Sequence, residues 1–239
     1  MLKEALSYLV SLKENKTYFI HGDTYSDKEL FRVAPYVNRP FLVTVNGLDS
    51  IVKLVRHELN TVGRNLPVFI RVDSPRFVEV IGALDSTMGR DHPYKAECDA
   101  PKFNCGWRDH DTAIIELRSM FIPNEGTEYL LDLLSRMSKE DGVTTDDNGI
   151  SQTVTTRQGI SLKNFEAVRG RIALRPFRTF AEVEQPESEF ILRLDDAGRV
   201  GLLEADGGYW KMEAKQNICR FFEKELAEEI SGGSVVVMM

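Results

Sequence analysis

The fold is decided by the stretch Phe190-Ile191-Leu192-Arg193-Leu194, Asp195-Asp196-Ala197-Gly198 and Val200-Gly201-Leu202-Leu203. Two short apolar runs flank a turn signal, and this pattern predicts a β-hairpin. From Trp210 to Ile230, apolar residues recur at helical spacing, which predicts one long amphipathic helix. Val235-Val236-Val237 then predicts a final strand.

Upstream of this stretch, helical and strand patterns alternate along the chain. We predict helices over 2–10, 51–63, 113–120 and 129–137, and strands over 18–20, 41–45, 68–72, 77–81, 150–158 and 171–175. Residues 86–110 read as a polar loop, and 146–149 as a turn. The fold class is therefore α/β or α+β, a mixed, largely antiparallel sheet with packed helices. We expect an N-terminal region over 1–106 and a C-terminal region over 107–239, or one continuous domain.

Composition excludes several classes of protein. The chain has 239 residues, of which 42% are hydrophobic and 28% charged, and this apolar fraction is too high for a disordered chain. No apolar run approaches the roughly 20 residues of a spanning helix, and the start lacks a signal peptide's apolar segment. Three cysteines cannot form a disulfide framework. We expect a cytoplasmic protein with no membrane association and no cofactor.

The net charge of −7 is concentrated at one end of the chain. Residues 181–239 hold thirteen acidic and six basic side chains, so residues 1–180 are neutral overall. An acidic chain offers no net basic surface, which argues against direct binding of duplex nucleic acid.

A short basic segment stands directly before the acidic one. Arg171, Arg175 and Arg178 could bind phosphates, because a guanidinium group matches a phosphate with two hydrogen bonds. The alternative is internal pairing with the acids that follow, at 182, 184, 187 and 189, and this alternative is favoured. Trp210 could stack on a planar ligand or belong to the core.

Two clusters could carry metal-dependent chemistry. Asp195, Glu204 and Asp206 lie on or beside the predicted hairpin, and converging carboxylates can bind Mg²⁺ for phosphoryl chemistry. The alternative for Asp206 is a cap on the following helix. His92, Cys98, Cys105 and His110 offer four zinc-type ligands, although the usual short spacing between cysteines is missing. The favoured interpretation is that neither cluster is a metal site.

The last third of the chain resembles a known family. The strongest stretch runs from Leu174-Arg175-Pro176-Phe177-Arg178 through Glu184-Gln185-Pro186, and 146–154, 190–194 and 203–210 continue it. It is similar to the YfdQ-like family of phage and prophage proteins, a group with a domain of unknown function, in its Gram-positive phage branch. The match covers about 40–238 and is strongest over 146–210. This resemblance implies a phage-encoded protein of the host cytoplasm, from early genes near recombination or replication functions.

We therefore expect a non-enzymatic phage accessory protein that forms a homo-oligomer and binds a host or phage protein or a small anionic ligand. A counter-defence role belongs to this class. Two alternatives stay open: a metal-dependent nuclease or phosphohydrolase that uses the three carboxylates, and a protein partner in a recombination or replication module. Familiar catalytic motifs are absent, which lowers the expectation of an enzyme. The candidate ligand-binding residues are Arg171, Arg175, Arg178, Glu184, Gln185, Glu204, Asp206 and Trp210.

Overall fold

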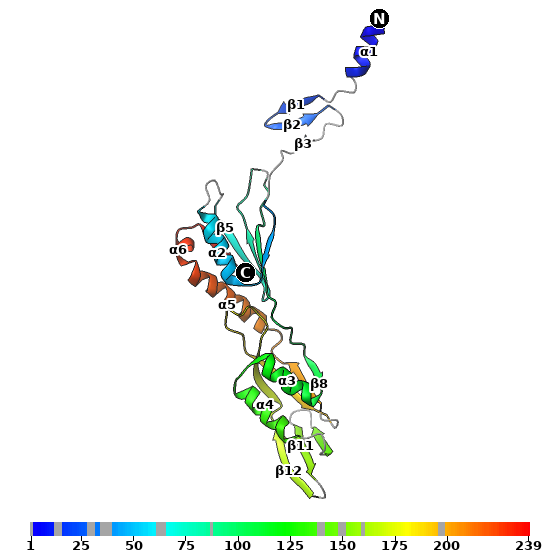
Figure 1. The fold of residues 1–239 in the computed structure, drawn as a ribbon, viewed down its shortest axis with the longest axis vertical. Coiled ribbons are helices and arrows are strands. Elements are labelled where there is room, and N and C mark those ends of the chain that lie inside the picture. The colour runs from blue at the N-terminus through cyan, green and yellow to red at the C-terminus, as the bar shows by residue number, and fades with distance from the viewer. Residues whose placement is uncertain are drawn as a thin grey trace. The chain divides into compact units, whose positions relative to one another are not determined.

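The computed structural model describes residues 2–11, 16–27, 32–33, 40–60, 66–86, 88–137, 142–147, 152–158, 161–195 and 199–239 (Figure 1). The chain divides into two compact units, Met1–Arg39 and Pro40–Met239. Two predicted turns fall partly outside the described residues, at 148–149 and at 196–198.

The first unit holds a helix and a small antiparallel sheet. Helix α1 spans Leu2–Ser11, and the strands β1 (Thr17–Ile20), β2 (Asp23–Ser26) and β3 (Arg32–Val33) pair in sequence order. His21 and Gly22 join β1 to β2 with positive φ angles of 52° and 91°. A two-residue turn of this hand matches the twist of the strands it connects.

The first sheet of the second unit is mixed, in the order β16-β5-β6-β7-β4. Its strands are β4 (Val43–Val45), β5 (Val68–Ser74), β6 (Phe77–Ile81), β7 (Tyr94–Glu97) and β16 (Val235–Met238). The strands β5, β6 and β7 are antiparallel, whereas β16 joins β5 and β4 joins β7 in parallel. Helices α2 (Leu48–Leu59) and α5 (Trp210–Glu225) share one buried apolar cluster with these strands.

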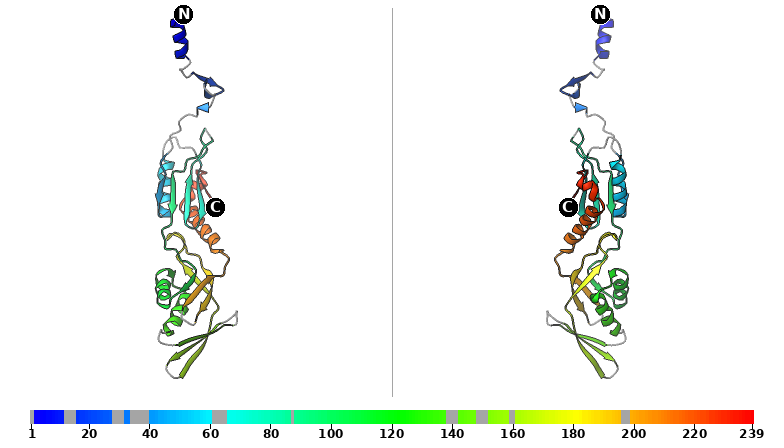
Figure 2. Two further views of the ribbon diagram at one scale, coloured as in Figure 1. Left: turned by 90° about the vertical axis from the view of Figure 1, so that its right-hand side faces the viewer. Right: turned by 90° about the vertical axis from the view of Figure 1, so that its left-hand side faces the viewer.

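The second sheet is antiparallel throughout, in the order β8-β15-β14-β13-β9. Its strands are β8 (Gly106–Arg108), β9 (Phe121–Ile122), β13 (Arg171–Pro176), β14 (Ser188–Leu194) and β15 (Val200–Glu204). Helices α3 (His110–Ser119) and α4 (Glu125–Arg136) cover one face, as Figure 2 shows. Alternate residues of β14 are buried, as expected for a strand with one covered face.

A third set of strands forms a meander. The strands β10 (Gly142–Asp147), β11 (Gln152–Gln158) and β12 (Ser161–Val168) pair antiparallel in sequence order. The strand predicted over 150–158 is present as β11 over 152–158, and its first two residues, 150–151, lie outside the described residues. The strands β10 and β12 extend it into a sheet that the sequence patterns did not predict.

The predicted fold class is confirmed. The sheets are mixed and largely antiparallel, and the hairpin of β14 and β15 forms as predicted. Some details differ from the prediction. The helix predicted over 210–230 ends at Glu225, and a short helix α6 (Ala227–Ser231) follows it. The strand predicted over 41–45 begins only at Val43. The polar stretch 86–110 also contains two strands, β7 and β8.

Segments far apart in sequence link the two sheets of the second unit. Phe180 and Val183, between β13 and β14, are buried in the first apolar cluster, whereas Leu174 and Phe190 on either side belong to the second. Helix α5 and strand β16 also return to the first cluster. The region boundary at 106/107 stays a prediction.

Candidate functional site

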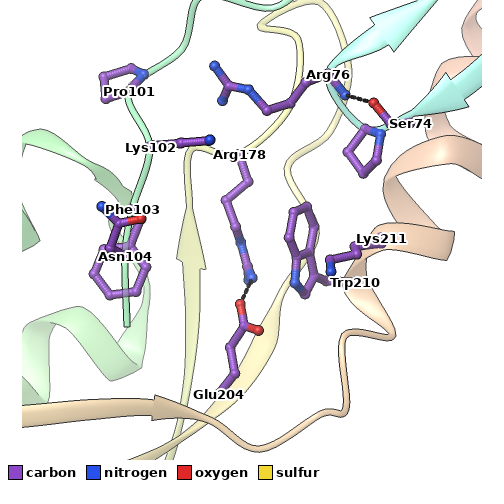
Figure 3. A pocket seen from close by; sticks show the side chains of 11 residues that line it. Ser74, Arg76, Pro101, Lys102, Phe103, Asn104, Arg178, Glu204, Trp210 and Lys211 are labelled. Carbon is purple, nitrogen blue, oxygen red and sulfur yellow. Dashed lines mark hydrogen bonds and ion pairs between the residues drawn. The ribbon is translucent and has the colours of Figure 1, made fainter. Parts of the chain in front are cut away.

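A pocket of about 410 Å³ opens where these linking segments meet (Figure 3). Five parts of the chain contribute: the turn between β5 and β6, the loop before β8, the residue two places after β13, the end of β15 and the start of α5. The lining residues are Ser74, Pro75, Arg76, Pro101, Lys102, Phe103, Asn104, Arg178, Glu204, Trp210 and Lys211. Its volume lies within the range of small-molecule sites, roughly 300–1,000 Å³.

The charge of the pocket is opposite in sign to that of the chain. Arg76, Lys102, Arg178 and Lys211 line it, against the single carboxylate of Glu204. A protein with a net charge of −7 thus gathers four cations around one cavity. A cationic lining inside a concave wall focuses the electrostatic field and attracts anions.

Arg178 is the buried centre of the pocket, with only 4% of its surface exposed. Its guanidinium donates to Glu204 Oε1 over 2.6 Å and to the Ser188 hydroxyl. It also stacks on the Trp210 ring at 4.2 Å from the ring centre. Burial lowers the pKa of Arg178, while the carboxylates of Glu204 and Asp206 act in the opposite direction. The result is a charged group held in one position before any ligand binds.

Gln185 fixes the backbone that carries Arg178. It is 3% exposed, and its side-chain oxygen accepts from the backbone N–H groups of Arg178 (2.9 Å) and Thr179 (3.1 Å). Its amide nitrogen donates to the Phe180 carbonyl over 2.9 Å. Gln185 was predicted to bind a ligand, but it is buried against the chain itself and does not line the pocket.

Asp206 organises the turn before α5. Its carboxylate accepts from the backbone N–H of Gly208 at 3.0 Å and of Trp210 at 3.4 Å. Burial acts to raise the pKa of Asp206, but these hydrogen bonds, one from Ser188 and the charge of Arg178 outweigh it and lower the pKa. The N-cap position of α5 is Tyr209, which has no side-chain cap, so Asp206 contacts the start of the helix from the preceding turn and positions Trp210.

Two donors of this cluster have no acceptor. Among the described residues, the buried Arg178 Nε and Trp210 Nε1 atoms make no hydrogen bond. An unpaired buried donor costs about 1–3 kcal/mol, so native proteins rarely keep one without a reason. Both side chains line the pocket, where they lie alongside each other (Figure 3).

The other three cationic side chains of the pocket differ in whether they already have hydrogen-bond or ion-pair partners in the chain. Arg76 donates to the carbonyls of Cys98 (2.7 Å) and Ala100 (2.6 Å), which fixes the loop before β8. Lys102 and Lys211 are exposed, and neither has an ion-pair partner within the described part of the chain. These two lysines can therefore turn toward an anion at little cost.

The remaining predicted arginines are paired outside the pocket, as the favoured alternative predicted. Arg171 bonds Glu189 at 3.1 Å, and Arg175 contacts Glu184 at 3.4 Å and Glu187 at 3.3 Å. Glu184 is thus a surface partner of Arg175 and does not line the pocket. Of the eight candidate residues, the pocket brings together only Arg178, Glu204 and Trp210.

The three carboxylates of the nuclease hypothesis do not converge. Asp195 pairs with Arg199 at 2.7 Å, at the turn end of the hairpin. Glu204 is at the other end of β15, about 13 Å further along at ~3.3 Å per residue. A shared Mg²⁺ needs its ligands at roughly 2 Å from one centre, so Asp195 cannot belong to such a site.

The four zinc-type residues are likewise separate. His92 contacts Glu79 at 2.7 Å, and His110 contacts the Leu134 carbonyl at 2.8 Å. Burial raises the pKa of the Cys98 and Cys105 thiols. Within the part of the chain that the structure describes, no three His, Cys, Asp or Glu side chains are placed to hold a metal ion.

Sequence reasoning missed most of the pocket wall. Arg76, Lys102, Phe103 and Lys211 are separated by up to 135 residues and share no motif. Pro101-Lys102 inside a polar stretch carried no signal, because its neighbours in space come from other elements.

In comparisons with known proteins, no family model, curated protein or solved structure matches the chain. None of the helices that the structure describes has the length and apolar character needed to cross a membrane.

Proposed function

We propose that this protein works by binding, and that the pocket around Arg178 holds a small anionic ligand. The observation that carries the proposal is the charge of the lining: four cations and one carboxylate in a chain that is otherwise acidic. A buried, pre-positioned guanidinium supplies specificity, and two exposed lysines supply adaptable charge.

The proposal keeps the biological setting that the sequence resemblance implies. In that setting the chain is a YfdQ-like phage accessory protein of the host cytoplasm, and sequestering a small anionic metabolite would be its contribution. The rigidity of the Arg178 loop supports binding, because a site that is ordered in advance loses little entropy when it captures a ligand.

Titration calorimetry with inorganic pyrophosphate tests the proposal. We expect saturable binding of one pyrophosphate per chain, weakened at least tenfold in the double variant Lys102→Gln/Lys211→Gln. Lys224→Gln is the matched control, since Lys224 lies exposed on α5 outside the pocket. Absence of binding to the unmodified protein, or an equal loss in the control, contradicts the proposal.

We also propose that the protein self-associates through β16. This strand is at the edge of the first sheet among the described strands, and its residues Val235-Val236-Val237-Met238 include no charge or proline. Edge strands of natural proteins usually contain a charged residue or a proline, which prevents pairing with another chain. A second copy related by a two-fold axis could continue the sheet there.

A further inference from the structure

We infer that the pocket takes a nucleoside phosphate with more than one phosphate group, an inference that rests on the proposed binding function. Three features of the wall point to this class: its net charge, its apolar surface, and the single carboxylate among the cations. A plain polyanion would use only the first of them.

Charge matching favours two phosphates. The lining carries four positive side chains and one negative one, a net charge of +3 at neutral pH. A terminal phosphate carries roughly −1.5 to −2 at pH 7, so a diphosphate group complements this lining. A single carboxylate would leave most of the positive charge unbalanced.

The apolar part of the wall favours a planar ring beside the phosphates. Trp210 and Phe103 face the pocket together with Pro75 and Pro101. Phe103 is held edge-on by Phe121 at 4.8 Å and by Phe190 at 5.8 Å between ring centres, so its position is fixed. All four nucleobases can stack on aromatic side chains of this kind, because each base has a planar π-face.

Glu204 favours binding of a nucleotide base together with its phosphates over binding of an anion alone. Its Oε1 is bound to Arg178, and its side chain remains 31% exposed. A carboxylate weakens the binding of phosphate by repulsion, yet it accepts hydrogen bonds from the N–H donors of a base edge. The unpaired N–H groups of Arg178 and Trp210 offer matching donors to ring nitrogens or carbonyl oxygens after a small side-chain shift.

Calorimetry on the full chain separates the ring from the phosphates. The probes are ADP, GDP, CDP and UDP, with inorganic pyrophosphate as the anion alone and with adenosine and guanosine as the ring alone. We expect at least one nucleoside diphosphate to bind tenfold or more tightly than pyrophosphate and than either nucleoside.

The variant Glu204→Gln tests the carboxylate, because glutamine can still accept from Arg178 while the charge is removed. We expect pyrophosphate to bind several-fold more tightly in this variant, and the preference for the nucleoside diphosphate to fall at least about fivefold. Glu223→Gln, an exposed acid on α5 outside the pocket, should change neither value. A thermal melt of each variant verifies that it is folded.

The outcomes distinguish this inference from the function on which it rests. If pyrophosphate binds as tightly as every nucleoside diphosphate, the inference is wrong and the anion-binding proposal stands. If neither pyrophosphate nor any nucleotide binds the unmodified protein, both are wrong. An unchanged nucleotide preference in Glu204→Gln removes Glu204 from recognition of the base.

Discussion

At the scale of the residue, the geometry of the pocket depends on buried polar groups that form hydrogen bonds with the chain itself. The side-chain oxygen of Gln185 accepts hydrogen bonds from two backbone N–H groups, and its side-chain nitrogen donates to a carbonyl of the loop between β13 and β14. These hydrogen bonds hold the loop that places Arg178 at the centre of the pocket. Replacing such a residue therefore affects stability and binding together.

Gln185→Leu should lower the free energy of unfolding by about 2–5 kcal/mol, because the N–H groups of Arg178 and Thr179 lose their acceptor inside the protein. The midpoint of urea denaturation measures the change. Glu187→Gln is the control, since Glu187 makes exposed contacts with Arg175 at 3.3 Å and with the Asn124 side chain at 3.4 Å, and its replacement should cost less than about 1 kcal/mol. Equal midpoints for Gln185→Leu and the unmodified protein would contradict this role.

The lowered pKa of Asp206 leads to a prediction about the stability of the protein at acidic pH. Its folded pKa lies below the ordinary value of 3.8, so it contributes stability that is present above that value and is lost as the pH falls through the folded pKa. We expect Asp206→Asn to be less stable than the unmodified protein at about pH 7 and to lose less stability on acidification to about pH 3.

Urea midpoints at the two pH values test this difference. Burial acts to raise the pKa of Glu229, but the hydrogen bond and charge of Arg56 outweigh it and lower the pKa, so some acid sensitivity should persist in Asp206→Asn. Glu223→Gln should keep the full acid sensitivity. Parallel pH profiles for Asp206→Asn and the unmodified protein would rule out the linkage.

At this scale the sequence indicated which side chains could bind a ligand better than it indicated where those side chains lie. Arg178, Glu204 and Trp210 were candidates because of their residue types, and all three line the pocket. Gln185 and Glu184 came from the same stretch but serve the loop and the surface. Residue type shows what a side chain can bind, whereas burial and register decide whether a ligand can reach it.

At the scale of the element, helix α4 approaches strand β13 closely at one point. A Cβ atom added to Gly126 would lie 2.1 Å from the carbonyl oxygen of Ala173. The capping box of Asn124 and Thr127 fixes the start of this helix, so the helix cannot shift without losing these bonds. The glycine therefore allows α4 to pack on the second sheet.

Gly126→Ala should destabilise the protein by about 1–3 kcal/mol, although alanine favours helix formation by ~1 kcal/mol over glycine. Chemical denaturation measures the net effect. Gly82→Ala is the matched control, because its new Cβ would meet Asp91 at an ordinary 3.5 Å. A more stable Gly126→Ala variant would show that α4 can move away from β13.

The elements also show what local patterns can predict. The strands β14 and β15 were predicted from alternation and a turn signal, since the chain pairs with itself over a few residues. The strands β7 and β8 were missed because their partners, β4, β6 and β15, lie elsewhere in sequence. The break between α5 and α6 at Leu226 was not predicted, because the helical spacing of apolar residues continues through it.

At the scale of the whole molecule, the boundary between the two compact units predicts an autonomous fragment. Residues 40–239 contain both apolar clusters and every residue of the pocket. We expect this fragment to melt cooperatively and to bind pyrophosphate within about threefold of the full chain's affinity. Circular dichroism and calorimetry measure these properties. Loss of cooperative melting would mean that the first unit is needed for folding.

The edge at β16 predicts the state of association. Val236 is 39% exposed on this strand, and Val236→Lys should convert a self-associated protein to a monomer in size-exclusion chromatography with light scattering. Leu203→Lys is the control, because Leu203 is similarly exposed at 41% but lies on β15, an interior strand of its sheet. A monomeric unmodified protein would rule out the interface.

The parallel pairing of β16 with β5 also constrains the order of events during synthesis. Strand β5 leaves the ribosome long before its partner β16, because the two strands lie far apart in sequence. Until β16 has been synthesised, β5 keeps one open edge, and Val68 lacks the neighbouring Val235 that helps to bury it. A nascent chain that has not yet reached β16 would thus expose an unpaired strand edge, so the addition of β16 is the step that protects this edge from aggregation.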